Sequence, residues 1–458
     1  MTTTIWAAAA LLSNGWAESV AIDIDDSGNI ASISSDQPYA SGDRVEILIP
    51  AIPNVHSHAH QRAMSGLGER AGVSGDAAKD SFWTWRKIMY HYLERIQPEH
   101  LFHISAQLYL EMLKAGYSCV GEFQYLHHDL DGAPYANRAE MSLQCMQAAQ
   151  QVGLGFTALP VLYRYGGFGS ADPIDGQKRF LNDAEGFIDI VTSLQQASAT
   201  DANISVGIAP HSLRAINGEL LREVVGALDN LAAIHVHIAE QAKEVEDCLA
   251  WSQMRPVEWL FDQFDVDPSW CLIHATHMND TETTAMAQSG CVAGLCPTTE
   301  ANLGDGLFNA IDYFRQDGCW AIGSDSHISI DPVEELRWLE YGQRLLTRKR
   351  NVLVSPGAAN TGRNLLDGAL KGGARACGRN IGSISTGARA DFIVLDDQHP
   401  RLYGRQQDDL LDSWIFSGNE NLVRDVYIGG NKIIDHGSHT DEETIQRNYR
   451  TALDQLAN

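Results

Sequence analysis

His56 and His58 stand two residues apart in an apolar segment that follows Pro53. Alternate side chains of a β-strand point to the same face, so both imidazoles are expected on one side of an extended segment. Imidazole is the nitrogen ligand that proteins most often offer to a catalytic zinc or iron ion. An isolated pair of this kind is more often a surface feature than a metal site, so its meaning depends on the residues that accompany it.

His237, His274 and Asp325 each stand at the end of a further apolar segment with the composition of a buried strand. Each has an ordinary explanation when taken alone, because a histidine can end a strand and Gly-Ser-Asp is a common turn. Four strand ends of one chain that all carry metal-binding side chains are hard to attribute to chance. Together with His56 and His58 they predict one site for a divalent ion.

The chain between residues 51 and 380 alternates strand patterns with helix patterns, which is typical of a parallel α/β architecture. Strands are expected at 54–58, 118–122, 155–162, 204–209, 233–238, 270–274, 292–296 and 321–323. Eight strand-then-helix units indicate a TIM (β/α)8 barrel, whose strands place catalytic side chains at their carboxyl ends. A doubly wound sheet would need a glycine-rich turn after its first strand, where this chain has His56-Ser57-His58 instead.

The two ends of the chain, residues 1–50 and 381–458, are rich in short strand patterns. Because the strands of one end need partners, we expect both ends to build one small β domain, with a helix over residues 441–456. A long connection over residues 66–95 follows the first barrel strand and carries Trp83, Trp85 and Arg86. Connections of this length usually form lids, binding walls or oligomer contacts.

A formal charge of −26 over 458 residues argues against binding to nucleic acid or to an anionic membrane surface. The eight cysteines show no Cys-x-x-Cys pair, which favours buried thiols over a disulfide framework. No basic residue precedes the apolar start at residues 5–12, so a signal peptide is not expected. These features predict a cytoplasmic protein.

The whole pattern resembles the amidohydrolase superfamily of metal-dependent deaminases and hydrolases. That resemblance implies a distorted TIM (β/α)8 barrel with a small β-sandwich domain built from both termini. The matching residues are His56-Ser57-His58, His237 with Glu240 three residues on, His274, Asp325 and the strand-like segment 386–396. No lysine stands at the end of the fourth strand to bridge two metals, so the resemblance points to the mononuclear deaminase branch.

The resemblance and the chemistry of the donor atoms imply a role for each residue. His56, His58, His237 and Asp325 would hold one divalent metal ion, with Zn2+ as the first choice and Fe2+ or Mn2+ as alternatives. The ion would lower the pKa of a water molecule, and Asp325 would accept that water's proton. Glu240 would carry a proton to the substrate nitrogen as general acid and base.

His274 would donate to the developing tetrahedral centre, or orient it. His277 stands three residues beyond His274 and is an alternative to it, since the ends of predicted strands are uncertain. His235 shares a strand face with His237 but lies two residues deeper, so we expect it in the core or behind the metal ligands.

Local segments resemble the branch of the superfamily that hydrolyses N-formimidoyl-L-glutamate to N-formyl-L-glutamate and ammonia in histidine degradation. These segments are 58–64, 82–86, 121–128, 209–215, 296–304 and 323–327. The resemblance implies substrate-binding roles for Gln61, Arg86, Tyr125, His211 and Arg214. Arginine suits such a small, dianionic, amino-acid-derived substrate, because its guanidinium binds a carboxylate through two hydrogen bonds. The related enzymes also imply a homodimer.

Two other functions compete with this one. The same fold could deaminate a purine, pteridine or triazine ring, but a flat neutral ring would not need Arg86 and Arg214. A metal-binding scaffold without activity is the second alternative. A structural zinc site is normally closed by four protein ligands and has no use for a proton carrier such as Glu240.

Overall fold

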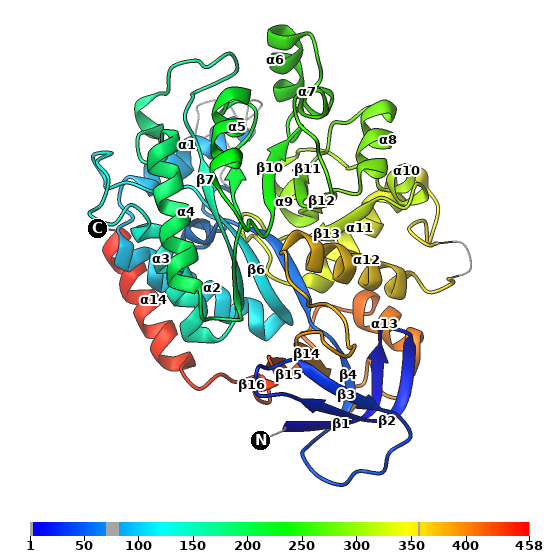
Figure 1. Ribbon diagram of the computed structural model, residues 1–458. Helices are drawn as coiled ribbons and strands as arrows, with labels where there is room; N and C mark the ends of the chain where they lie inside the picture. The colour runs from blue at the N-terminus through cyan, green and yellow to red at the C-terminus, as the bar shows by residue number, and fades with distance from the viewer. Residues whose placement is uncertain (1–2, 70–81, 356–357, 458) are drawn as a thin grey trace.

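The computed structural model describes residues 3–69, 82–355 and 358–457. Strands from the two ends of this part of the chain form one seven-stranded sheet in the order β16-β15-β14-β4-β1-β2-β3. They are β1 (Thr3–Leu12), β2 (Gly15–Ile24), β3 (Ile30–Ser34), β4 (Asp43–Pro50), β14 (Phe392–Leu395), β15 (Val423–Ile428) and β16 (Asn431–Ile434). The N-terminal strand β4 pairs antiparallel with the C-terminal strand β14, as expected for a sheet built from both termini (Figure 1).

The strands between β4 and β14 form two parallel sheets. The first joins β5 (Ile52–Ser57), β6 (Tyr117–Gln124), β7 (Gly155–Leu162) and β8 (Ile204–Val206), with β9 (Ala209–Pro210) beside β7. The second joins β10 (Ile234–Ile238), β11 (Trp270–His274), β12 (Val292–Leu295) and β13 (Cys319–Ile322). Strands such as β5, β6 and β7 are buried at every position, as expected of parallel strands that are covered on both faces.

The two parallel sheets meet along both of their outer edges. A parallel bridge joins Ser57 to Asp325 at one edge, and a parallel bridge joins Ile208 to Ile234 at the other. Strands that run in parallel end on the same side, so the residues that follow β5, β10, β11 and β13 are brought together. This arrangement places the histidines and the aspartate predicted from the sequence around one point.

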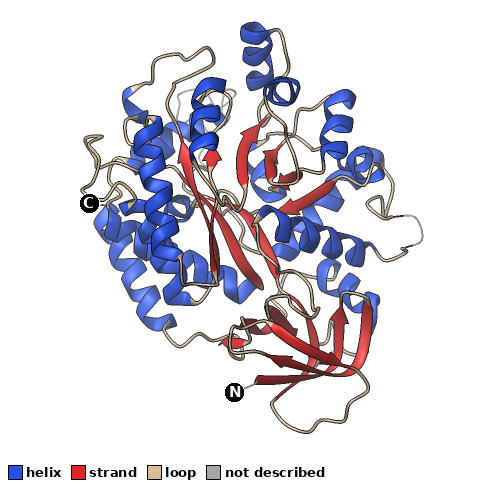
Figure 2. Ribbon diagram, in the orientation of Figure 1, coloured by secondary structure: helices blue, strands red, loops and turns tan. Residues whose placement is uncertain are grey.

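Helices cover the outer faces of the parallel strands (Figure 2). The helices of the described ranges are η1 (Ala59–Met64), α1 (Phe82–Leu93), α2 (Pro98–Ala115), α3 (Glu140–Val152), η3 (Asp175–Gln177), α4 (Ala184–Ser198), α5 (Gly218–Ala227), α6 (Ala242–Ser252), α7 (Pro256–Gln263), α8 (Asp280–Ser289), α9 (Pro297–Leu303), α10 (Ala310–Arg315), α11 (Pro332–Thr347), α12 (Thr361–Ala376), α13 (Gln407–Phe416) and α14 (Glu442–Ala457). Helix α2 begins at a proline in its first turn and ends at Gly116, which adopts the left-handed conformation at φ 101°.

The C-terminal region contains one helix where the sequence suggested only strands. Helix α13 buries Leu410, Leu411, Trp414 and Ile415, a spacing that makes one helical face. The predicted terminal helix is confirmed as α14, which packs against α2 (Figure 1).

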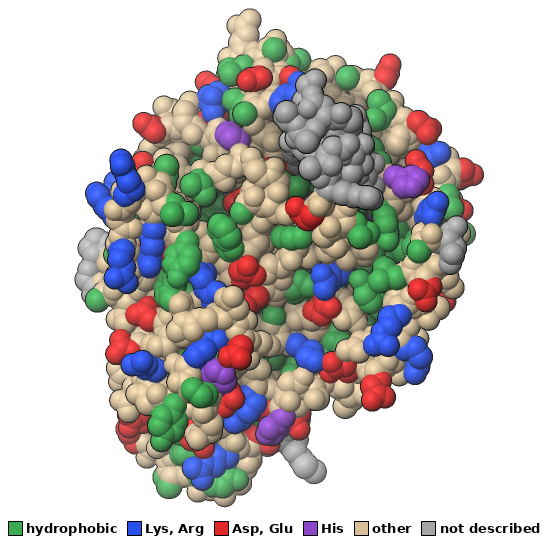
Figure 3. All heavy atoms as spheres, turned by 180° about the vertical axis from the view of Figure 1, so that it is seen from behind, with side chains coloured by type: hydrophobic (Ala, Val, Ile, Leu, Met, Phe, Trp, Pro, Cys, Tyr) green, Lys and Arg blue, Asp and Glu red, His purple; other side chains and the backbone are tan. Residues whose placement is uncertain are grey.

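Charged side chains of both signs are interspersed over the face shown in Figure 3, although the formal charge of the whole chain is −26. Within the described ranges, none of the helices has the length and apolar composition that crossing a membrane requires.

Candidate active site

The two histidines of the first motif end β5 and face the space between the parallel sheets. The rings of His56 and His58 lie 4.6 Å apart between centroids, and both rings face Asp325. His58 Nδ1 lies 2.9 Å from the carbonyl oxygen of Phe123. Because a carbonyl oxygen only accepts, this nitrogen carries the proton, and the Nε2 lone pair points to the centre of the site.

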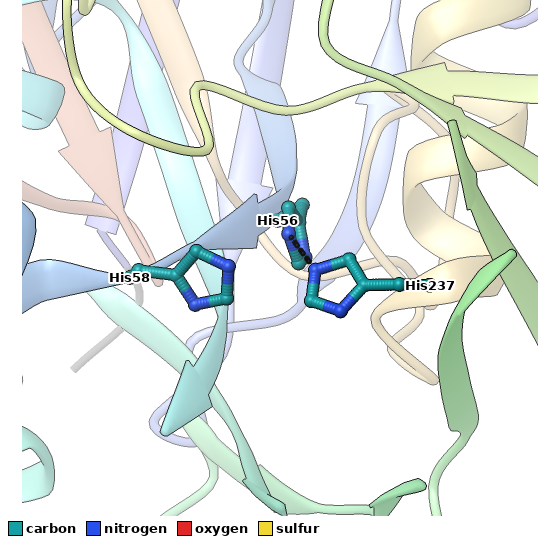
Figure 4. A group of neighbouring side chains, drawn as sticks. All are labelled: His56, His58 and His237. Carbon is teal, nitrogen blue, oxygen red and sulfur yellow. Dashed lines mark hydrogen bonds between the residues drawn. The ribbon is translucent and has the colours of Figure 1, made fainter. Parts of the chain in front are cut away.

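His237 is held in the same manner from the opposite sheet. Its Nδ1 lies 3.0 Å from the carbonyl oxygen of His211, so its Nε2 also presents a lone pair. That Nε2 lies 3.0 Å from His56 Nε2 (Figure 4). The three imidazoles converge from two strands, and their arrangement favours a cation between them.

Asp325 completes the group from the turn after β13. Its Oδ1 lies 3.4 Å from His56 Nε2 and 3.4 Å from His58 Nε2. In a tetrahedral zinc site with nitrogen and oxygen ligands, neighbouring ligand atoms are about 3.3 Å apart. Ligand atoms of His56, His58 and His237 all lie within 4.8 Å of one another, as do those of His56, His274 and Asp325. The donor set therefore fits one divalent ion.

The protonation of this group also suits a cation. Burial lowers the pKa of His56 to about 3, and it lowers the pKa values of His58 and His237 as well. Burial alone would raise the pKa of Asp325, but the hydrogen bond to His56 and the positive charge of His274 lower it below its ordinary value. Neutral imidazoles and an ionised carboxylate are the forms that bind metal.

His274 differs from the other three imidazoles. Its Nδ1 lies 3.3 Å from Glu300 Oε1, and its Nε2 lies 3.7 Å from Asp325 Oδ2. Burial would lower the pKa of His274, but the hydrogen bond to Glu300 and the charges of Glu240 and Asp325 raise it to about 10. A protonated imidazole is a proton donor and a poor metal ligand, which separates His274 from His56 and its neighbours.

Glu240 is buried three residues beyond His237 and lines the same cavity as His274. Burial raises the pKa of Glu240, while the charges of His274 and Arg214 oppose that shift. A raised pKa makes a carboxyl group better able to hold a proton that it can later transfer.

The strand ends that carry these groups adopt unusual backbone conformations. His274 has φ 68°, Asp325 has φ 47° and Ala239, next to Glu240, has φ 50°. Residues other than glycine rarely adopt this left-handed backbone conformation. It persists where several surrounding contacts hold the backbone in place. Asp325 is fixed on both sides, because its amide donates to the His56 carbonyl oxygen (2.9 Å) and its own carbonyl accepts from the His58 amide (3.2 Å).

One cavity joins the buried donors to the residues predicted to bind substrate. It is lined by His58, Gln61, Trp85, Arg86, Met89, Tyr90, Tyr125, Tyr163, Phe180, His211, Arg214, His237, Glu240, His274, Leu303, Asp325 and Ser326. All five predicted substrate-binding residues are in this lining, together with five of the six predicted metal-binding or catalytic residues. His56 lies fully buried beneath them.

The predicted substrate-binding residues also contact one another. Gln61 Nε2 donates to Tyr125 Oη (3.1 Å), and Arg86 Nε donates to Tyr90 Oη (2.6 Å). Helix α1, part of the predicted long connection, thus forms a wall of the cavity through Trp85 and Arg86. The side chain of Trp83 lies outside the described residues.

A family model described as "Amidohydrolase family" matches residues 47–433. A second model, "Formimidoylglutamate deiminase HutF, N-terminal domain", matches residues 2–46. The chain belongs to the amidohydrolase family.

Individual relatives are similar to this amidohydrolase over nearly their whole length. A formimidoylglutamate deiminase of Pseudomonas aeruginosa is 48% identical over 99% of this chain and 99% of its own. The crystal structure of an amidohydrolase from Brucella melitensis has a TM-score of 0.94 at 46% identity, with 100% of both chains covered. An adenosine deaminase from Xanthomonas campestris shares the fold, with a TM-score of 0.81 at 21% identity over 99% of this chain and 98% of its own.

His235 and His277, which stand near His237 and His274 in the sequence, do not line the cavity. His235 is buried beneath the site, with its Nε2 2.7 Å from the carbonyl oxygen of Ala376, as expected for a core residue. His277 is absent from the cavity lining, and its backbone carbonyl accepts from Arg255 Nη2.

Sequence reasoning missed several residues that support the site. Glu300 pairs with His274, Glu122 bonds to both residues that flank His58, and Tyr163 lines the cavity. Glu122 and Glu300 stand in segments already singled out for the resemblance. A lone acidic residue within a buried apolar run, as in Val120-Gly121-Glu122-Phe123, is the signal that could have revealed a partnered carboxylate.

Proposed function

We propose that this amidohydrolase is a formimidoylglutamate deiminase that hydrolyses N-formimidoyl-L-glutamate to N-formyl-L-glutamate and ammonia in histidine degradation. It is a hydrolase that acts on C–N bonds. The observation that carries the substrate assignment is a cavity that joins a metal-type donor set to two arginines, Arg86 and Arg214. The similarity to the Pseudomonas aeruginosa deiminase over 99% of both chains supports it.

The proposed architecture is a distorted TIM (β/α)8 barrel over residues 51–380, with a small β-sandwich domain from residues 1–50 and 381–458. The bridges at both edges of the two parallel sheets support closure into a barrel. The protein would be a cytoplasmic homodimer.

His56, His58, His237 and Asp325 would hold the metal ion, which is Zn2+ by preference and Fe2+ as the alternative. Three nitrogen donors and one carboxylate suit either ion. When bound, the ion would lower the pKa of a water molecule towards neutrality, so that the water can act as nucleophile.

The proton steps fall to three acidic or basic side chains. Asp325 would take the proton that the attacking water loses, because its carboxylate is ionised and faces the donor group. Glu240 would deliver a proton to the departing nitrogen, as its raised pKa allows. His274 would donate a hydrogen bond to the reacting carbon's new oxygen from its protonated ring. The reaction consumes one water molecule and yields the N-formyl group and ammonia.

The five remaining residues would bind and orient the substrate. Arg86 and Arg214 would each meet a carboxylate, and His211 and Tyr125 would add hydrogen bonds. Gln61 offers both a donor and an acceptor, which suits the amidine-like formimidoyl group. The contact between Gln61 and Tyr125 would hold both side chains ready at the cavity wall.

Ammonia release with N-formimidoyl-L-glutamate, guanine and cytosine as separate substrates tests this function. The proposal expects rapid release from N-formimidoyl-L-glutamate alone. Equal rates, or a preference for either ring, would replace it with the ring-deaminase function.

A further inference from the structure

A chain of buried polar side chains runs beneath the proposed metal ligands. We call it the polar belt, and its members are Asn54, Ser57, Glu122, Ser324 and His327, all buried. They come from β5, which carries His56 and leads into His58, from the neighbouring strand β6, and from the turn after β13 that carries Asp325. None of the five lines the substrate cavity.

The belt is continuous. Asn54 Nδ2 donates to Ser324 Oγ (2.7 Å), and Ser324 Oγ lies 3.1 Å from His327 Nδ1. His327 Nε2 lies 3.2 Å from Ser57 Oγ, which donates to Glu122 Oε2 (2.5 Å). Each hydroxyl group can donate one hydrogen bond, so this order fixes the rest. Ser57 donates its single hydroxyl proton to Glu122, so His327 Nε2 must donate to Ser57. The other ring nitrogen, Nδ1, then accepts from Ser324.

Every hydrogen bond of the belt therefore points towards Glu122. This carboxylate also accepts from the Ala59 amide (2.7 Å) and from Tyr109 Oη (3.0 Å). Ser57 and Ala59 flank His58 on both sides, so Glu122 fixes the backbone around that ligand. At the other end of the belt, the Asn54 amide oxygen accepts from the backbone N–H groups of His56 and Ser324.

We infer that Glu122 is a positioning residue for the metal centre, acting through the polar belt to fix the backbone that carries His56, His58 and Asp325. The inference rests on the proposed metal centre. Groups that orient metal ligands from behind commonly change metal affinity when they are lost. Here the belt links three separate elements, so one carboxylate would set the spacing of ligands from two sheets.

A glutamine at position 122 would disrupt this arrangement with little change in volume. A carboxylate accepts at both oxygens, whereas an amide must place its NH2 group where one oxygen stood. That NH2 group would face either the Ala59 N–H or the hydroxyl groups of Ser57 and Tyr109. The Ala59 N–H cannot reverse its direction, so the amide oxygen would stay there, and Ser57 would have to accept instead of donate. The hydrogen bonds through Ser57 and His327 would then reverse, so Ser324 would accept from both Asn54 Nδ2 and His327 Nδ1 and its own hydroxyl proton would lose its partner.

The test is competition for zinc between the full-length protein and a chromophoric chelator, at about pH 8. Burial raises the pKa of Glu122 to about 7, so the wild-type carboxylate is ionised under this condition. Glu122→Gln and Ser57→Ala should each raise the zinc dissociation constant about 10- to 100-fold. Excess zinc should then restore ammonia release, which a mere loss of folding would not allow.

Tyr109→Phe is the matched control. It removes one donor to the same carboxylate but leaves Ser57, Ala59 and the belt in place. Its zinc affinity should equal that of the wild type, while its thermal midpoint without metal reports the general cost of altering a buried partner of Glu122.

The outcomes separate the two hypotheses. A wild-type protein that binds no zinc would refute the proposed metal centre itself. Wild-type binding of one zinc per chain with unchanged affinity in Ser57→Ala and Glu122→Gln would overturn the role of the belt alone. If Glu122→Gln does not fold, unchanged affinity in Ser57→Ala decides against the belt, and weakened affinity supports it.

Discussion

The cavity has two regions that are built in different ways. Its floor carries the proposed metal-binding and proton-transfer residues, and its mouth carries the two arginines proposed to bind substrate. On the floor, His58 and His237 bond through Nδ1 to backbone carbonyl groups of β6 and of the segment after β9. At the mouth, Arg86 bonds to another side chain, Tyr90, on the same helix. Backbone partners are fixed by the sheets, whereas a side-chain partner can change with one substitution. The difference indicates that the backbone of the sheets positions the residues on the floor, whereas side-chain contacts position the residues at the mouth that would select the substrate.

The two regions also differ in charge. The floor gathers Asp325 and Glu240 with neutral imidazoles, which suits a cation. The mouth contributes Arg86 and Arg214, although the whole chain carries a formal charge of −26. Two local cations in an acidic protein are expected where a dianion must be held close.

Metal removal tests the floor and should have the largest effect. Treatment with a chelator should reduce ammonia release to the uncatalysed background, because neutral imidazoles and Asp325 cannot activate water by themselves. Adding Zn2+ back should restore the activity. Full activity in protein that elemental analysis shows to be free of metal would contradict the proposed role of His56, His58, His237 and Asp325.

Glu240→Gln separates proton transfer from metal binding on the same floor. The amide cannot carry a proton, so kcat should fall about 10²- to 10⁴-fold, the usual contribution of general acid–base catalysis. The zinc content should not change, because the ligand atoms come from other residues. Unchanged turnover would remove Glu240 from the proton path, and loss of zinc would make it a ligand.

The floor was easier to predict from the sequence than the mouth. His56, His58, His237, His274 and Asp325 each follow an apolar strand, and parallel strands bring such ends together by geometry alone. The strand 155–162 was predicted with the bounds that the structure has. The pattern of apolar residues is sufficient to predict the bounds of an element that is buried along its whole length.

The contacts at the mouth and behind the ligands could not be derived in this way. Arg86 was singled out by resemblance, and its partner Tyr90 depends on the orientation of α1. The pairing of Glu300 with His274 joins residues 26 positions apart, through the packing of α9 against the strand ends. The predicted strand 204–209 is interrupted at Gly207, giving β8 and β9. Such features arise from tertiary packing, which local patterns do not encode.

Arg214→Met tests the mouth. A hydrogen bond to a charged group contributes about 1.5–3 kcal/mol, so KM for N-formimidoyl-L-glutamate should rise about 10- to 100-fold. The kcat value should change much less, because the floor is intact. Arg315→Met is the matched control, since Arg315 is exposed and pairs only with the nearby Asp312 among the contacts described. A fall in kcat with an unchanged KM would move Arg214 from substrate binding into the chemistry.

His277→Ala should have the smallest effect and sharpens the boundary of the floor. The His277 side chain is not part of the cavity lining, while its backbone amide bonds to Ala239 and its carbonyl to Arg255, contacts that alanine keeps. Substitutions of this kind usually change stability by about 0.5 kcal/mol or less, so kcat and KM should stay close to their wild-type values. His274→Asn, measured in parallel, should lose most of its turnover because it removes the proton-donating ring. If the two variants lost activity equally, the proton donor could not be assigned to His274 alone. His277 would then have to be counted among the residues that take part in the reaction.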